Sequence, residues 1–316
     1  MSEALRRNRS SSLVAGVTGL LLVLAMPVAA RQGQMPPPPP ARGYLKAHAN
    51  VQHPLGLLGG PISVDINQTS GGVFVALPDA RKLDPAVFGT PDHPLATGGT
   101  PGINGLPMMA RGQENGRFTM MKGMSPFGDK NMVMGNGHLT LHMVDATATD
   151  AATSEDRVRM EASWQDRDGN TYTVRCCRML ATHGLEFPTF GGVVTNHLLH
   201  GFTRIGTALM PTEFTYAGFW GMGAVLKNGE VLDQPRLIHG MLTEYVRGEG
   251  YKLNADEDVT PTRRQFHLMV APFAPNMQSG HFDRKPVKTG LKLPNGMELP
   301  FWHVMFENLD ISAARN

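Results

Sequence analysis

Cysteine is almost absent from the chain, and the two cysteines present, Cys176 and Cys177, are neighbours. Adjacent residues cannot cross-link distant segments, so a fold held together by several disulfides is excluded. On a strand, the two side chains would point to opposite faces. Three states therefore stay open: one buried and one exposed thiol, a disulfide between the neighbours, or a bond to another chain.

Net charge is also lacking once the N-terminus is set aside. The whole chain has a formal net charge of +2. The first 30 residues carry this surplus, in Arg6, Arg7 and Arg9 against Glu3. The remainder is formally neutral, and a neutral protein has no electrostatic attraction for phosphate backbones or anionic membranes. We therefore expect no nucleic-acid partner.

The common catalytic motifs are missing. The sequence contains no Walker phosphate loop and no H-E-x-x-H zinc motif. The glycine cluster at 218–223 lies among aromatic residues, whereas a phosphate loop must open a helix. The segment 123–126, Gly-Met-Ser-Pro, is a poor nucleophile elbow, because its proline has no N–H to donate to an oxyanion. Motifs of this kind thus assign no reaction to the chain.

Helical periodicity is scarce as well. The 36 glycines and 24 prolines interrupt most helical windows, and only 195–202 suggests a short turn of helix. Apolar and polar residues alternate instead at 62–66, 138–143 and 157–164, which is typical of half-buried strands. Asn-Gly or Asp-Gly pairs predict tight hairpin turns at Asn136-Gly137, Asp168-Gly169, Asn228-Gly229 and Asn295-Gly296.

These patterns predict an all-β fold. We expect an antiparallel β-sandwich or barrel with long Gly/Pro-rich loops and little helix. Residues 61–316 are predicted to form this β-rich domain, either as one unit or as two packed sheets or halves. The Gly-, Pro- and Thr-rich segment 78–116 is expected to consist mostly of loops.

The N-terminus has the pattern of an export signal. Basic residues precede an apolar run at 13–28, which ends in Val28-Ala29-Ala30 with small residues where a signal peptidase cleaves. The run is shorter than the roughly 20 residues that a membrane span needs. We predict a signal peptide at 1–30, a periplasmic or secreted protein, and no integral membrane span after cleavage. Residues 31–60, with prolines at 36–40, are predicted to be a stiff Pro-rich tether.

Histidine and methionine are abundant, with 12 and 20 residues. Three predicted strands near the C-terminus each contain the pattern His-x-Met. The pairs are His239 and Met241, His267 and Met269, and His303 and Met305. Because residues i and i+2 face the same side of a strand, neighbouring strands would bring these imidazoles and thioethers to one pocket. This donor set suits copper, above all Cu(I), better than magnesium or calcium.

Three classes of function remain after these exclusions. The favoured one is a binding module that holds a small apolar ligand or a copper ion in a pocket lined by Met, His and the aromatic residues at 214–220 and 301–302. The second is a periplasmic enzyme that pairs His239, His267 or His303 with Glu244 or Glu307 for acid–base chemistry. The third is a structural protein of the cell envelope, for which the predicted tether and the β content argue.

Overall fold

A computed structural model describes the chain from residue 44 onward, with gaps. The described residues are 44–46, 48–49, 51, 61–68, 70–88, 111–114, 117–131, 135–146, 155–180, 185, 189–203 and 205–315. The predicted signal peptide at 1–30 and most of the predicted tether at 31–60 lie outside this set. The description below therefore concerns the β-rich part of the chain.

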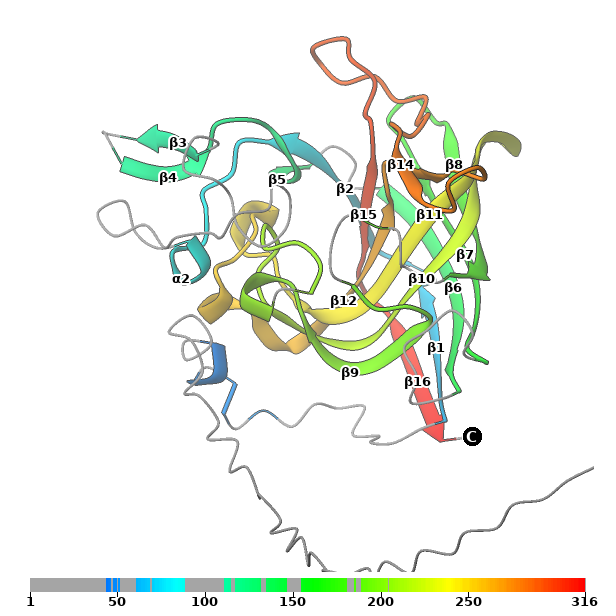
Figure 1. Cartoon of the computed structure of the whole chain (residues 1–316), viewed down its shortest axis with the longest axis horizontal. Helices are drawn as coiled ribbons and strands as arrows, with labels where there is room; N and C mark the ends of the chain where they lie inside the picture. The colour runs from blue at the N-terminus through cyan, green and yellow to red at the C-terminus, as the bar shows by residue number, and fades with distance from the viewer. Residues whose placement is uncertain are drawn as a thin grey trace, which may run out of the picture. The chain divides into compact units, whose positions relative to one another are not determined.

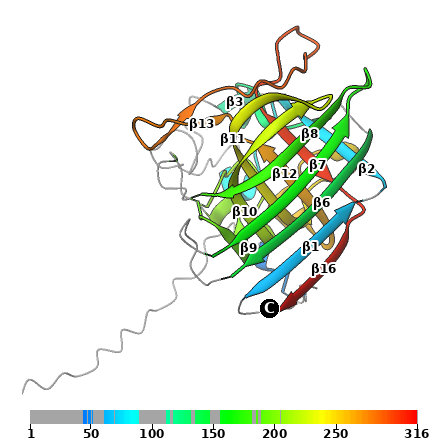
Figure 2. The ribbon, with the colours of Figure 1, turned by 90° about the vertical axis from the view of Figure 1, so that its right-hand side faces the viewer.

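Eight antiparallel strands close into a barrel in the order β6-β7-β8-β10-β11-β12-β15-β2. Their bounds are β2 Gly72–Asp79, β6 Gly135–Asp145, β7 Arg157–Gln165, β8 Thr171–Met179, β10 Glu213–Lys227, β11 Glu230–Tyr245, β12 Thr260–Val270 and β15 Trp302–Phe306. Figure 2 shows β8, β7 and β6 side by side along one wall. The all-β prediction is confirmed, and of its two forms the barrel is the one observed.

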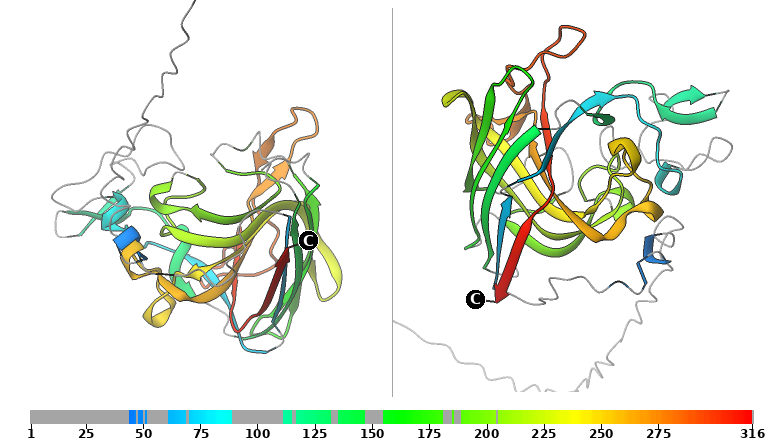
Figure 3. Two further views of the ribbon diagram at one scale, coloured as in Figure 1. Left: turned by 90° about the horizontal axis from the view of Figure 1, so that it is seen from below. Right: turned by 180° about the vertical axis from the view of Figure 1, so that it is seen from behind.

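Further strands extend the barrel wall. β1 (Ile62–Gln68) pairs with β6 and carries β16 (Asp310–Arg315) on its other side, while β5 (Ser125–Asn131) pairs with β2. β9 (Val193–Leu199) pairs with the first half of β10. Two small hairpins stand apart: β3 (Arg111–Glu114) with β4 (Arg117–Met121), and β13 (Phe273–Pro275) with β14 (Phe282–Arg284). Figures 1 and 3 show the long yellow-green strands β10 and β11 curving around the barrel.

Helix is scarce, as predicted. The described part of the chain contains the short helix α2 (Pro85–Phe88) and the 3₁₀ turns η2 (Gly201–Thr203), η3 (Glu249–Tyr251) and η4 (Asp256–Asp258). None of the helices described has the length and hydropathy of a membrane span.

The helical turn expected at 195–202 is wrong. Residues 193–199 form strand β9, and only η2 follows it with helical turns. The first half of β10 extends beyond its partner β8, which pairs with residues 221–227 only. The exposed edge at 213–219 needs another strand to satisfy its backbone groups, and β9 supplies it.

Three of the four predicted hairpin turns occur. Asp168-Gly169 joins β7 to β8, Asn228-Gly229 joins β10 to β11, and Asn295-Gly296 closes a turn between β14 and β15. The turn at Asn136-Gly137 is wrong, because both residues lie inside β6. A Cβ atom on Gly137 would overlap the side chain of Val73, so glycine is required here for the close approach of β2 and β6 that seals the barrel.

The interior of the barrel is filled by apolar side chains. The main buried cluster takes residues from all eight barrel strands, which places it inside the ring. Within it the Trp302 ring lies 5.0 Å from the Trp164 ring and 4.9 Å from the Tyr172 ring. A closed barrel of eight strands is just wide enough for side chains to fill it. The barrel interior is therefore a packed core.

Two further features resolve points that the sequence left open. Cys176 and Cys177, on β8, form a disulfide with each other. Tyr44, from the segment assigned to the tether, is 2% exposed and donates a hydrogen bond of 2.6 Å to Oε2 of Glu244. His48 Nε2 lies 3.2 Å from Oε1 of the same carboxylate. These contacts hold Tyr44 and His48 against β11.

Candidate functional site

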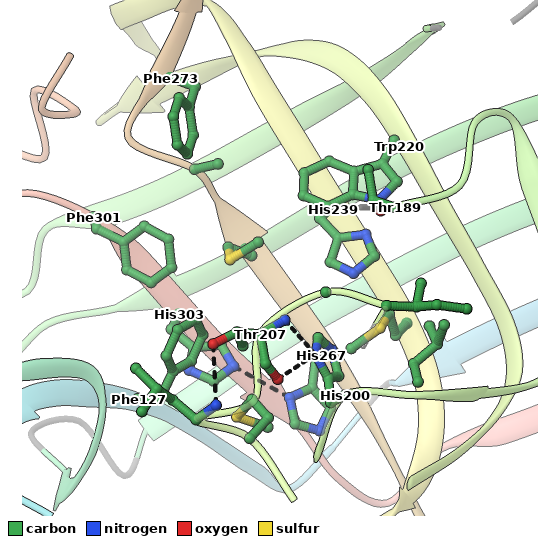
Figure 4. Close-up of a pocket in the computed structure, with 18 of the residues that line it drawn as sticks. Phe127, Thr189, His200, Thr207, Trp220, His239, His267, Phe273, Phe301 and His303 are labelled. Carbon is green, nitrogen blue, oxygen red and sulfur yellow. Dashed lines mark hydrogen bonds between the residues drawn. The ribbon is translucent and has the colours of Figure 1, made fainter. Parts of the chain in front are cut away.

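A cavity lies on the outer face of β10, β11, β12 and β15. On β12, Phe266, Leu268 and Val270 belong to the barrel core, whereas the alternating residues His267 and Met269 line the cavity. The opposite wall comes from residues 199–200, 205–207 and 209–210 with Phe127, and the loop that carries Thr207 crosses in front of His267 in Figure 4. The cavity has a volume of about 330 Å³.

The three His-x-Met strands are direct neighbours. β12 pairs with β11 on one side and with β15 on the other, so His239, Met269 and His303 form one cross-strand row. Met241, His267 and Met305 form the next row. Five of these six side chains line the cavity. Met305 does not, because it packs with Phe74 and Ala76 in a separate buried cluster.

The contacts of the imidazoles bear on the predicted copper site. His267 Nδ1 lies 3.2 Å from His303 Nε2, within hydrogen-bond distance, so an ion bound between them would have to break this contact. Among the described residues, no three His, Cys, Asp or Glu side chains gather in a way that would hold a metal ion. Copper binding by His239, Met241, His267, Met269, His303 and Met305 stays a prediction, which Cu(I) titration of the untagged protein tests.

One end of the cavity is aromatic. Figure 4 shows Phe273 and Phe301 on one side and Trp220 on the other. Trp220 and Phe301 are 2% and 4% exposed and share a buried cluster with Phe190. Trp220 sits where β9 and β8 diverge along β10, which opens room on this face of the sheet. These walls suit the flat or branched hydrocarbon surface of a small molecule.

The other end is a cluster of buried polar groups. His200, His267 and His303 line the cavity here, and Glu213 lies near His200 and His267 without lining it. Glu213 is 0% exposed, with Oε1 at 3.8 Å from His200 Nε2 and Oε2 at 3.7 Å from His267 Nε2. Neither distance is short enough for a hydrogen bond. The polar end is thus a set of imidazoles near a buried carboxyl group.

Burial keeps these groups neutral. Desolvation lowers the pKa of His200 to about 4 and that of His239 to about 3, and it lowers the pKa values of His267 and His303 well below the usual range. Desolvation also raises the pKa of Glu213 well above its ordinary value, with the neighbouring carboxylate of Glu244 acting in the same direction. The imidazoles are neutral at pH 7, and Glu213 is protonated over a wider pH range than an exposed carboxyl.

The carboxylates expected to assist the histidines have other partners. Glu244 accepts hydrogen bonds from the Tyr44 hydroxyl and from the backbone N–H of Phe214. Glu307 accepts from the Tyr245 hydroxyl at 2.6 Å and pairs with Arg263. Neither carboxylate lines the cavity.

Sequence reasoning did not bring Glu213 and His200 together in this site. Their proximity to His267 depends on contacts between segments that are distant in the chain. The only local signal is a lone carboxylate at the start of the aromatic segment 214–220, where a charged residue needs a special environment. That signal is too weak to identify a site.

Comparison with protein-family models, with curated proteins and with solved structures finds no match to this chain.

Proposed function

We propose that this chain is a binding protein for a small, uncharged, largely apolar molecule held on the outer face of the barrel. The observation that carries this proposal is the cavity of about 330 Å³ between Trp220, Phe273 and Phe301 at one end and neutral imidazoles at the other. Ligand pockets typically combine such a volume and apolar lining with a few polar groups that set orientation. Cationic ligands are disfavoured because no acidic residue lines the cavity within the described part of the chain, and the charged side chain that does line it, Arg284, is exposed to solvent on β14.

A neutral fluorophore tests this proposal. N-phenyl-1-naphthylamine should bind the purified protein saturably, with one site per chain. The variant Ala271→Phe places a ring in the cavity, because Ala271 lines it and is 1% exposed. Overpacking of about 1–3 kcal/mol should weaken binding about 5- to 150-fold.

The matched control is Ala314→Phe, since Ala314 lies exposed on β16 and does not line the cavity. Its affinity for the fluorophore should equal that of the wild type. Equal loss of affinity in both variants, or no saturable binding by the wild type, would show that the cavity is not a ligand site.

The same proposal places the protein outside the cytoplasm, in the periplasm or in the medium. It is supported by the basic and apolar leader that ends at Ala30 and by the Cys176–Cys177 disulfide, which an oxidising compartment allows to persist. Intact mass spectrometry of protein from cells that carry the natural gene should give a mature chain that begins at Arg31. A cytosolic protein of full-length mass would contradict the export proposal.

A further inference from the structure

His239 presents one bare ring nitrogen to the ligand cavity. Its Nδ1 lies 2.7 Å from the carbonyl oxygen of Phe219. A carbonyl oxygen only accepts hydrogen bonds, so Nδ1 carries the ring proton and donates it. In the neutral ring, Nε2 is then a lone-pair acceptor. No described residue donates a hydrogen bond to it.

The protein holds this ring in one orientation. The imidazole stacks on the Trp220 indole, with ring centres 4.0 Å apart and planes inclined by 12°. Figure 4 shows the ring extending from β11 beneath Trp220 into the cavity. Because burial lowers the pKa of His239 to about 3, the ring stays neutral and its acceptor persists at physiological pH. The acceptor is therefore fixed before any ligand arrives.

His267 and His303 use their accepting nitrogens within the protein, whereas Nδ1 of His303 and Nε2 of His200 have no hydrogen-bond partner among the described residues. Gln265 Nε2 lies 3.3 Å from the carbonyl oxygen of Glu244, which orients this amide as a donor, and 2.8 Å from His267 Nε2. His267 Nε2 accepts that bond, so its proton sits on Nδ1 and is donated to His303 Nε2. His200 Nδ1 lies 3.1 Å from the backbone nitrogen of Thr207 and 3.2 Å from its carbonyl oxygen. The accepting nitrogens of His267 and His303 are therefore not left for a ligand.

The residues around His239 Nε2 restrict which ligand group can bind to it. Met269, Ala271 and Phe301 surround the cavity with apolar surface. A cationic amine would enter without a carboxylate to compensate its charge, since no acidic residue lines the described walls. An ionised carboxylate has no proton to donate to Nε2. A neutral hydroxyl satisfies both limits, because it donates one hydrogen bond and carries no charge.

We propose that the ligand is an apolar alcohol or phenol whose hydroxyl group donates a hydrogen bond to Nε2 of His239. This inference rests on the proposed function, since it names the chemical class that the same cavity binds. The hydrocarbon body of the ligand lies among Phe273, Phe301 and Met269. The hydroxyl meets the imidazole beneath Trp220.

A pair of matched ligands tests the inference. 2-Naphthol and 2-methoxynaphthalene share one ring system, but only the first can donate a hydrogen bond. Calorimetric titration of the untagged wild type should give 2-naphthol an affinity about 3- to 10-fold higher than that of its methyl ether, which is the effect of one net hydrogen bond. The ether is the more hydrophobic compound, so apolar burial alone would favour it.

Two variants assign the effect to one residue. His239→Phe keeps a ring against Trp220 but removes the acceptor, and it should bind both compounds with equal affinity. His142→Phe replaces a solvent-exposed histidine of β6 that does not line the cavity, and it should keep the preference for 2-naphthol. The wild-type comparison alone remains decisive if either variant fails to fold.

The possible results distinguish a failure of the hydroxyl-ligand inference from a failure of the proposed binding function. If the wild type binds both compounds equally, or binds the ether more tightly, the hydroxyl class is wrong and the apolar binding function stands. If His239→Phe keeps the preference, His239 is not the acceptor. If neither compound binds, the hydroxyl-ligand inference is wrong. If N-phenyl-1-naphthylamine also fails to bind, the proposed binding function is wrong as well.

Discussion

Replacing Trp302 by alanine is expected to lower the free energy of unfolding by about 3–5 kcal/mol. The Trp302 side chain is 1% exposed and packs against Trp164 and Tyr172 in the main buried cluster. Eight closed strands surround the space that the indole leaves, so the wall can collapse only partly onto the cavity. Urea unfolding followed by circular dichroism measures the loss.

Two other substitutions show whether this loss comes from packing. Met277→Ala should change stability by less than about 0.5 kcal/mol, because Met277 is 89% exposed. Trp302→Phe should cost less than Trp302→Ala, since it keeps a ring and removes a buried indole N–H without a hydrogen-bond partner in the described structure. A Trp302→Ala protein as stable as the Met277→Ala protein would mean that the barrel interior is not the main core.

The packed interior explains why the ligand cavity lies outside the barrel. His303 immediately follows Trp302 on β15, and the two side chains point to opposite faces of the strand. One face of β11, β12 and β15 completes the barrel core, and the other forms the floor of the cavity. The strands that stabilise the fold thus also position the binding residues, which gives the site a rigid base.

Alternation along the strands predicted much of this arrangement. The two-residue period correctly predicted the strands at 62–66 and 157–164, and it placed each His-x-Met pair on one face. The closure of the barrel was beyond sequence reasoning. It depends on two residue pairs between β2 and β6, Gly72–Asn136 and Val73–Gly135, which are far apart in the chain and lack a local signature.

The arrangement of the candidate binding site also depends on contacts between distant segments, which the sequence pattern does not show. The pattern could not show that Met305 packs under Phe74, because this depends on which segment covers each part of the outer face. The environment of Glu213 could not be predicted for a related reason. Glu213 lies beside His200 and His267, which come from other segments, so its unusual environment is a tertiary property that the local sequence does not encode.

Glu213 is the group whose replacement should raise stability most clearly at neutral pH. Its carboxyl is 0% exposed, and both oxygens lack a hydrogen-bond partner among the described residues. Burial raises its pKa well above the ordinary value, so the folded protein favours the protonated form. The stabilisation that this proton provides is complete below the unfolded pKa of about 4.3, and it is lost as the pH rises toward the folded pKa. Glutamine keeps the shape and cannot ionise.

Glu213→Gln should therefore match the wild type near pH 4 and become the more stable protein above it. The difference should grow by up to about 1.4 kcal/mol per pH unit until the folded pKa is reached. Urea unfolding of both proteins between pH 4 and pH 8 measures it. The lowered pKa values of His200 and His267 also make stability depend on pH, but both proteins share these groups, so this contribution largely cancels in the comparison.

Glu161→Gln is the matched control, because Glu161 is a solvent-exposed partner of Arg175 on the barrel wall. Its stability should follow that of the wild type within about 0.5 kcal/mol at every pH. A wild type that is more stable than Glu213→Gln at pH 8 would mean that Glu213 is ionised and pairs with a protonated His200 or His267. The floor of the cavity would then carry a charge pair, and the case for an uncharged ligand would be lost with it.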